Sequence, residues 1–343
     1  VLQHVPSGSL GFIVVNDVSA AVHHAGDFAS NMAPDTNGDT LMEEMLDDME
    51  LGEGFNPNGG FAIVMLDPAD FDFDLFETWA QATGMGGYDP YGDDVIEEEG
   101  FEEEGAEDVA EEDVDDSSSM VPAVFLVAGT SFEEIFPSMG GTLVADGEVT
   151  KIIPEYAYGT VFYTANQGSY VLLSPNKQAI MAVRNATDYV EMGLSQPQVD
   201  AINAADGAAF IDMTIATPAL ISIMDSFMEL AMEEMPANGP YTVEDIERQL
   251  DELGDQLSQM ENILATYAVA EKGISVQTSL AYVAGSEQAQ LLASMPSGNR
   301  SLLNWLPNNN YVFAMGSVVN EPATMKDLYI ENLKDSMAMA VYF

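Results

Sequence analysis

An acidic stretch near the start of the chain carries oxygen ligands at the spacing of a calcium-binding loop. Four side chains fall at positions one, three, five and nine of such a loop: Asp35, Asn37, Asp39 and Glu43. A calcium loop of this kind also has Gly at position six and a bidentate acid at position twelve. This chain has Thr40 and Leu46 there. The stretch therefore predicts either a weak calcium site or an Asx-rich turn that caps a helix beginning near Thr40.

A second group of carboxylates recurs at every other residue: Asp70, Asp72 and Asp74. On a β-strand this period places all three on one side and the intervening apolar residues on the other. Two interpretations follow, an edge strand with a solvated face and a carboxylate ladder that collects cations. Calcium is the one cofactor that these two groups indicate.

The sequence lacks the patterns that are typical of an enzyme. Cysteine is absent, which excludes disulfides, thiolate metal sites and cysteine nucleophiles. The three histidines are His4, His23 and His24, and the adjacent pair would point about 100° apart on a helix. No nucleophile elbow, phosphate-binding Gly-Lys loop or dinucleotide fingerprint is present. We therefore expect no catalytic residues, and an exported hydrolase is the third of three functional interpretations.

The charge of the chain restricts its partners. It has 58 acidic and 8 basic residues, a net charge of −50, and no Lys or Arg from Val1 to Thr150. Such a field repels phosphate backbones and anionic lipid, so we expect no nucleic-acid partner, while divalent cations would relieve the self-repulsion. No segment approaches the roughly 18 apolar residues of a membrane span. An acidic surface and an initial Val rather than Met predict an extracellular or cell-surface protein whose export signal has been removed.

The most acidic segment is Asp93–Asp116, which holds fifteen Asp and Glu residues. Like charges at this density do not pack at neutral pH. We expect a disordered acidic insertion over residues 89–119, either solvated or binding cations diffusely.

Apolar runs of strand length alternate with capped helical segments. The predicted strands include Leu10–Val15, Gly60–Leu66 and Ala123–Gly129, and a hairpin is expected to turn at Asn166–Gly168. A strand, a turn and a helix recur from Leu10, Ala123, Ala208 and Tyr311. The pattern predicts an α+β fold of repeated strand–helix units with a mainly antiparallel sheet.

A heptad pattern in the second half predicts a long antiparallel helical hairpin over residues 217–271. Its apolar positions, spaced alternately by four and three, are Ile246, Leu250, Leu253, Leu257, Met260, Leu264 and Tyr267. The segment Pro236–Pro240 would reverse the chain, and the longer arm would measure about 40 Å. The hairpin is expected either to pair within the chain or to project toward another molecule.

These patterns divide the chain into two parts. Residues 1–205 form an α+β domain that contains the acidic insertion. Residues 206–343 form a second α+β unit that contains the helical hairpin and a restart of the opening pattern at 306–343.

Five phrases carry a resemblance to a group of exported proteins. They are VPSGSLGFIVVNDV, VPAVFLVAG, GSYVLLSPNKQAIMAV, GISVQTSLAYVAGSEQAQ and LLNWLPNNNYVFAMGSV. In their order they resemble the uncharacterised exported α/β-repeat proteins of planctomycete-type bacteria. The resemblance implies export and no known catalytic residues.

The last residues of the sequence are uncharged, apolar and of strand length. They include Met337, Met339, Val341, Tyr342 and Phe343. Such a strand either folds back into its own sheet or pairs with a sheet edge of a neighbouring copy. We expect a homopolymer, the cation-dependent structural subunit of an extracellular filament, sheath or surface layer. The alternative is an envelope-associated module that binds a peptide, lipid or polysaccharide.

Overall fold

The computed structural model describes residues 1–31, 33, 37–71, 121–139, 141–154, 160–234, 243–271 and 273–294. Within these ranges, the side chains of residues 226–234, 243–245 and 247 are not described. The chain divides into two compact units, Val1–Ala281 and Tyr282–Phe343. The described part of the second unit contains one helix, α10 (Glu287–Ser294).

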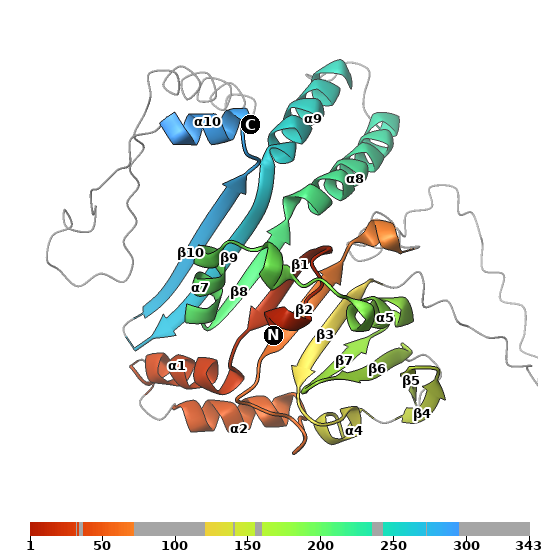
Figure 1. Cartoon of the computed structure of the whole chain (residues 1–343), viewed down its shortest axis with the longest axis vertical. Helices are drawn as coiled ribbons and strands as arrows, with labels where there is room; N and C mark the ends of the chain where they lie inside the picture. The colour runs from red at the N-terminus through yellow and green to blue at the C-terminus, as the bar shows by residue number, and fades with distance from the viewer. Residues whose placement is uncertain are drawn as a thin grey trace, which may run out of the picture. The chain divides into compact units, whose positions relative to one another are not determined.

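The first unit is built on one sheet of ten described strands (Figure 1). Their spatial order is β10-β9-β8-β1-β2-β3-β7-β6-β5-β4, and each pairing from β9 to β4 is antiparallel. This confirms the α+β class with a mainly antiparallel sheet. The bounds of the strands are β1 (Ser9–Val15), β2 (Phe61–Leu66), β3 (Ala123–Ala128), β4 (Gly141–Asp146), β5 (Val149–Pro154), β6 (Phe162–Gln167), β7 (Tyr170–Ser174), β8 (Gly207–Asp212), β9 (Met260–Ala270) and β10 (Gly273–Tyr282).

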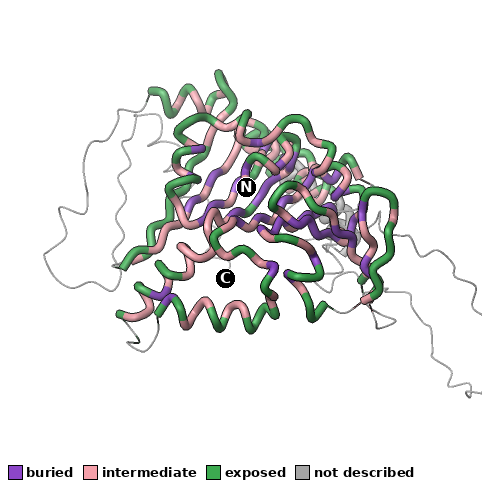
Figure 2. Tube along the Cα trace, turned by 60° about the horizontal axis from the view of Figure 1, so that its bottom comes forward, coloured by how far each residue is buried: buried purple, intermediate pink, exposed green. Residues whose placement is uncertain are grey.

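One face of the sheet, the first face, is covered along its centre. The covering elements are η1 (Leu2–His4), α5 (Lys177–Asn185), α6 (Val190–Gly193) and α7 (Gln196–Ala204). Alternate residues of the central strands, such as Phe12, Val64 and Leu126, pack beneath them. Buried residues accordingly concentrate in the central strands (Figure 2). This is the main hydrophobic core of the unit.

The opposite, second face is covered at the end where β1 finishes and β2 begins (Figure 1). Its covering helices are α1 (Val18–Ser30), α2 (Gly38–Asp48) and the single-turn α4 (Phe132–Ile135). Phe132 and Ile135 of α4 pack on Val171 and Leu173 of β7 to form a second, smaller core. The rest of this face is less covered, and Ile13 of β1 is 50% exposed.

Local signals form the cap of α4 and the turn of the β6–β7 hairpin, and the sequence predicts the second of these at Asn166–Gly168. Ser131 caps α4, and the β6–β7 hairpin turns at Gly168, whose φ of +64° is one that Gly adopts without strain. Ser174 and Pro175 precede α5 and have the residue types of a helix cap and a first-turn Pro, but they do not cap the helix. Asn176 is the cap, because Ser174 is the last residue of β7 and its hydroxyl donates to the Ala123 carbonyl at 2.7 Å.

The long helical hairpin expected over residues 217–271 is not confirmed, and its expected reversal at Pro236–Pro240 lies outside the described residues. The two helices α8 (Met213–Glu234) and α9 (Val243–Ser258) pack on each other, but Met260–Ala270 forms β9 instead of continuing α9. Met260 and Leu264 are four apart and share one side in a helix or in a strand, so this pair does not distinguish the two. Pairing with β8 favours the strand, and it moves Tyr267 to the face opposite Leu264.

The repeated strand–helix units are not established by the described residues. Helices follow β1, β3 and β8, but these helices have 13, 4 and 22 residues, and the start of the fourth expected unit, Tyr311, lies outside the described residues. The expected domain boundary after residue 205 falls within the first unit, directly before β8. Because β8 pairs with β1 over Gly207–Ile211, the sheet continues across that boundary.

The contact between α1 and α2 depends on two glycines. A Cβ on Gly26 would meet the backbone nitrogen of Gly38, and a Cβ on Gly38 would lie 2.7 Å from the Cα of His23. The backbones therefore approach more closely than any larger residue permits.

We predict that Gly26→Ala destabilises the fold by about 1–3 kcal/mol, because the added methyl group forces α1 away from the start of α2. Urea denaturation measures the change. Gly193→Ala is the matched control, since no atom lies within 4 Å of the added Cβ. Equal stabilities of the two variants would contradict the close packing.

Candidate functional site

The four residues of the expected calcium loop do not act together in the described structure. Asn37 caps α2 by accepting a hydrogen bond from the Thr40 N–H at 3.0 Å, as the Asx-turn interpretation predicts. Asp39 lies 3.1 Å from Nε2 of His23, and Glu43 is exposed on α2. Asp35 lies outside the described residues. The described members thus form a helix cap and a contact between helices.

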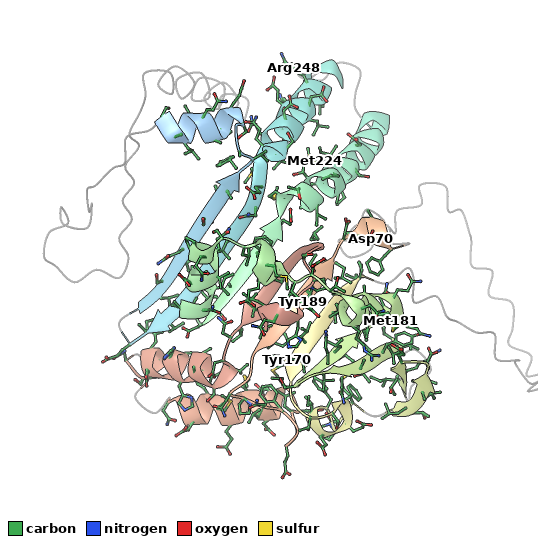
Figure 3. All side chains as sticks on the ribbon, viewed as in Figure 1. Asp70, Tyr170, Met181, Tyr189, Met224 and Arg248 are labelled. Carbon is green, nitrogen blue, oxygen red and sulfur yellow. The ribbon has the colours of Figure 1, made fainter. Side chains whose placement is uncertain are left out.

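Asp70, the first residue of the second acidic group, does not lie on a strand. Asp70 is the last residue of the 3-10 turn η2 (Pro68–Asp70), which Asp67 caps (Figure 3). Asp72 and Asp74 lie outside the described residues, as do Asp93–Asp116 and the five C-terminal assembly residues from Met337 to Phe343. Within the described ranges, no three His, Asp or Glu residues gather closely enough to hold a metal ion.

The outer edge of β10 is a long, uncharged strand edge. No described strand pairs with it, and Gly273–Tyr282 contains no ionisable acid or base other than the phenol of Tyr282. Natural proteins protect such edges with charge, Pro, bulges or short length. This strand is ten residues long and contains neither a charged residue nor Pro. Its backbone N–H and C=O groups are therefore suited to pairing with another strand.

An apolar row on β10 accompanies this edge. Ile274, Val276 and Leu280 are 59%, 67% and 47% exposed. Ser279 and Ala281 border a depression with Leu264, whose side chain is on the first face, so the alternating apolar residues point to the second face. Ile13 of β1, which β9 and β8 separate from β10, is also exposed on this face. Exposed apolar residues in one row are typical of a surface that contacts another molecule.

The opposite edge of the sheet, β4, is made nearly neutral by its neighbours. Asp146 at the end of β4 lies 2.6 Å from the Lys177 ammonium, and Glu148 in the following turn pairs with Arg184 at 3.6 Å. Arg184 also donates to the Glu148 carbonyl. Both basic residues belong to α5, and they are two of only eight in the chain. Leu143 and Val144 of β4 are 37% and 41% exposed.

In a chain of charge −50, each of these two edges presents an exposed strand without net negative charge. Two copies of so acidic a chain repel each other over most orientations, and close approach is least opposed where the charge is neutralised. This arrangement fits strand-to-strand contact between copies.

Sequence reasoning missed both edges. The heptad pattern assigns residues up to Tyr267 to a helix. Because β9 is therefore not predicted, β10, which follows β9 in the chain and in the sheet, is not predicted either. The signal was present, because Ile274, Val276, Thr278 and Leu280 alternate with small or polar residues. The neutralisation of β4 had no local signal, since Lys177 and Asp146 are far apart in the chain.

Comparisons of the chain with protein-family models, with curated proteins and with solved structures found no match. Among the described helices, none combines the length and apolar character that crossing a membrane requires.

The contact between His23 and Asp39 gives a pH-dependent test. His23 Nδ1 donates to the Ser19 carbonyl at 2.7 Å, and this bond, followed by the bond to Asp39, raises the pKa of His23 above its usual 6.5. Because the folded pKa is raised, the contact stabilises fully below pH 6.5 and is lost as pH rises through the raised value.

We predict that NMR titration places the His23 pKa above 6.5 and that Asp39→Asn lowers it. Glu43→Gln is the control, because Glu43 lies in the same helix and is not among the groups that shift His23. A His23 pKa that is the same in Asp39→Asn as in the wild type would show that the contact does not persist in solution.

Proposed function

We propose that this protein is a structural subunit that polymerises through the two edges of its sheet, with β10 of one copy pairing with β4 of the next. The observation that carries the proposal is the uncharged, exposed edge of β10, with Val276 67% exposed. Strand addition at an open edge gains backbone hydrogen bonds that a solvated edge makes only with water.

The two edges differ, which determines how contacts would repeat. A surface that pairs with an identical surface closes into a dimer, whereas two different surfaces leave a free edge at each end. Pairing of β10 with β4 therefore repeats from copy to copy and continues the sheet. This supports a filament or sheath, in agreement with the homopolymer that the sequence predicts.

The acidic remainder of the chain supports cation dependence and a location outside the cell. Fifty net negative charges per copy oppose polymerisation at low ionic strength, and the screening length is only about 10 Å at 0.1 M salt. A saline or calcium-containing exterior relieves this repulsion without binding at one defined site.

We predict that Val276→Glu abolishes assembly while the subunit remains folded. The substitution places a charge on an exposed position of the edge strand, where it opposes pairing and disturbs no core contact. Sedimentation velocity and negative-stain microscopy measure assembly, and circular dichroism measures folding. Met192→Glu is the matched control, because Met192 is 70% exposed on α6, which covers the first face of the sheet and is not part of either edge strand.

The second edge has its own test. Lys177→Gln leaves Asp146 without its cation at 2.6 Å, so it should weaken assembly in the same way without altering β10. Wild-type protein that is monomeric at all concentrations and salt conditions, or that forms only closed dimers, would contradict the proposed polymer.

We predict that calcium lowers the protein concentration needed for assembly more than sodium chloride of equal ionic strength does, because a divalent ion screens and bridges carboxylates. Light scattering during addition of calcium and then of chelator measures the effect. If chelator leaves assembly unchanged and sodium chloride acts as strongly as calcium, the cation dependence is screening alone and the calcium proposal is wrong.

A further inference from the structure

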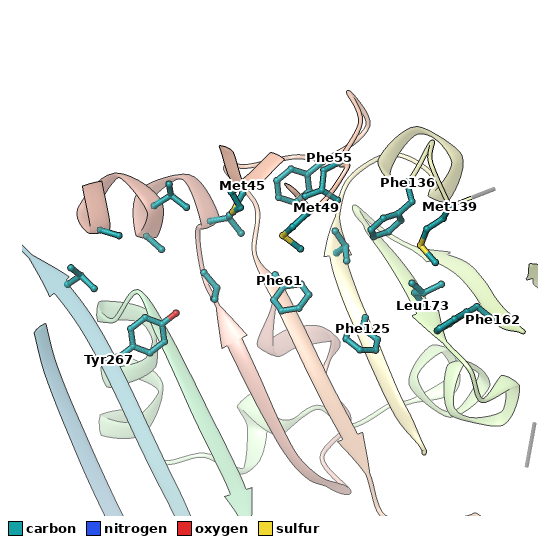
Figure 4. A pocket seen from close by; sticks show the side chains of 18 residues that line it. Met45, Met49, Phe55, Phe61, Phe125, Phe136, Met139, Phe162, Leu173 and Tyr267 are labelled. Carbon is teal, nitrogen blue, oxygen red and sulfur yellow. The ribbon is translucent and has the colours of Figure 1, made fainter. Parts of the chain in front are cut away.

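An apolar cavity of about 620 Å³ lies between the α1–α2 pair and the second face of the sheet (Figure 4). Aromatic side chains of the central strands form its floor, including Phe61 and Phe125. Met45 of α2 and Met49, the C-cap of that helix, contribute to its roof. Ligand-binding pockets commonly have volumes of about 300–1,000 Å³. The cavity is thus of a size that holds a small molecule.

The cavity exists because α1 presents short side chains to the sheet. Val18, Ala21, Val22 and Ala25 recur at the spacing of one helical face, and all four line the cavity. These side chains do not reach the floor. The position of α1 is fixed at the cavity's end by His24, whose Nδ1 lies 2.7 Å from Oδ1 of Asp206.

The lining has almost no capacity for hydrogen bonds. The floor strands β1, β2, β3 and β7 are each paired on both sides, so their backbone groups are engaged in the sheet. The described side chains that line the cavity are apolar except for Tyr267. A peptide segment inside would leave its amide groups without partners, which strongly disfavours it. A hydrocarbon chain needs no such partners.

Tyr267 supplies one polar group at one end of the cavity. Its ring lies against Gly207 on the neighbouring strand, where an added Cβ would be 2.6 Å from Cζ. Its hydroxyl makes no hydrogen bond to any described residue. Burial, followed by the nearby charge of Asp206, raises the pKa of this phenol, so it remains protonated and able to donate.

The carboxylate of Asp206 is not free to bind a ligand. One oxygen bonds to His24, and the other accepts from the Val269 N–H at 2.6 Å. No charged residue lines the cavity in the described structure. A cationic head group therefore has no partner there, and the charge of −50 repels an anionic one.

We propose that this cavity binds a neutral lipid, with its hydrocarbon chain on the aromatic floor and an uncharged ester or hydroxyl oxygen accepting a hydrogen bond from Tyr267. The three methionines of the lining, Met45, Met49 and Met139, adapt readily to chains of different shape. The site is separate from both sheet edges, so the proposal does not depend on polymerisation.

Fluorescence titration with N-phenyl-1-naphthylamine, an uncharged apolar dye, tests the site. We expect the wild-type protein to bind the dye and 1-monooleoylglycerol to displace it at concentrations at least about tenfold lower than oleate does, because the carboxylate of oleate is repelled. Absence of dye binding, or displacement by oleate at the same concentration, would overturn the proposal.

Substitutions assign the binding to the cavity. Ala25→Phe fills it from α1 and should abolish dye binding, and Ala21→Phe tests the same effect from the adjacent turn if the first variant unfolds. Ala182→Phe is the matched control, on an exposed position of α5 on the first face. Dye binding by both filled variants at wild-type affinity would overturn the assignment.

Two further variants separate the lipid site from other apolar surfaces. Tyr267→Phe should retain the dye but weaken monooleoylglycerol about threefold to tenfold, the effect of one lost hydrogen bond. Val276→Glu, which alters the β10 edge, should leave dye and lipid binding unchanged. Loss of dye binding in Val276→Glu would place the dye on the exposed sheet surface and contradict the proposed site.

Discussion

Mutual repulsion of acidic side chains is the constraint on which the arrangement of this protein depends. Fifty net negative charges cannot be brought close together in a low-dielectric interior, so contacts within the fold are made by the residues that carry no charge. Among the described residues, the buried side chains of the two cores include no ionisable acid or base except the phenol of Tyr163. The same constraint extends to the surface, where β10 is uncharged and β4 is neutralised by Lys177 and Arg184. A chain with so few basic residues uses two of them at one edge of its sheet.

Asp206 is an instructive exception to this rule. Its side chain is 9% exposed, and it is tolerated because each of its polar groups has a partner. The carboxylate bonds to His24 of α1 and to Val269 of β9, and the backbone bonds to Asn16 after β1 and to Tyr267 of β9. One residue thus joins two strands to the helix that covers the second face. Asp206 thereby holds α1 in place above the sheet, and the short apolar side chains of α1 leave the cavity between them.

The edges and the cavity place demands of different kinds on the fold. An edge contact uses backbone hydrogen bonds and needs only that charge be absent or neutralised. The cavity uses apolar area and needs α1 and α2 to be held at a fixed distance from the sheet, which the glycine contact of Gly26 with Gly38 and the bonds of Asp206 provide. Because β10 and the cavity share no residue, a change in one leaves the other intact.

The local sequence determined those strands and turns whose pattern is contained in a few consecutive residues. The apolar runs at β1, β2 and β3 and the hairpin at Gly168 follow from side-chain period and backbone freedom, and the net charge follows from composition. Residues far apart in the chain decided the rest. Met260–Ala270 is compatible with a helix or a strand, and pairing with β8 made it a strand. The neutral edge at β4, the bonds of Asp206 and the cavity beneath α1 exist only when distant segments meet, because each requires a partner that no local pattern specifies.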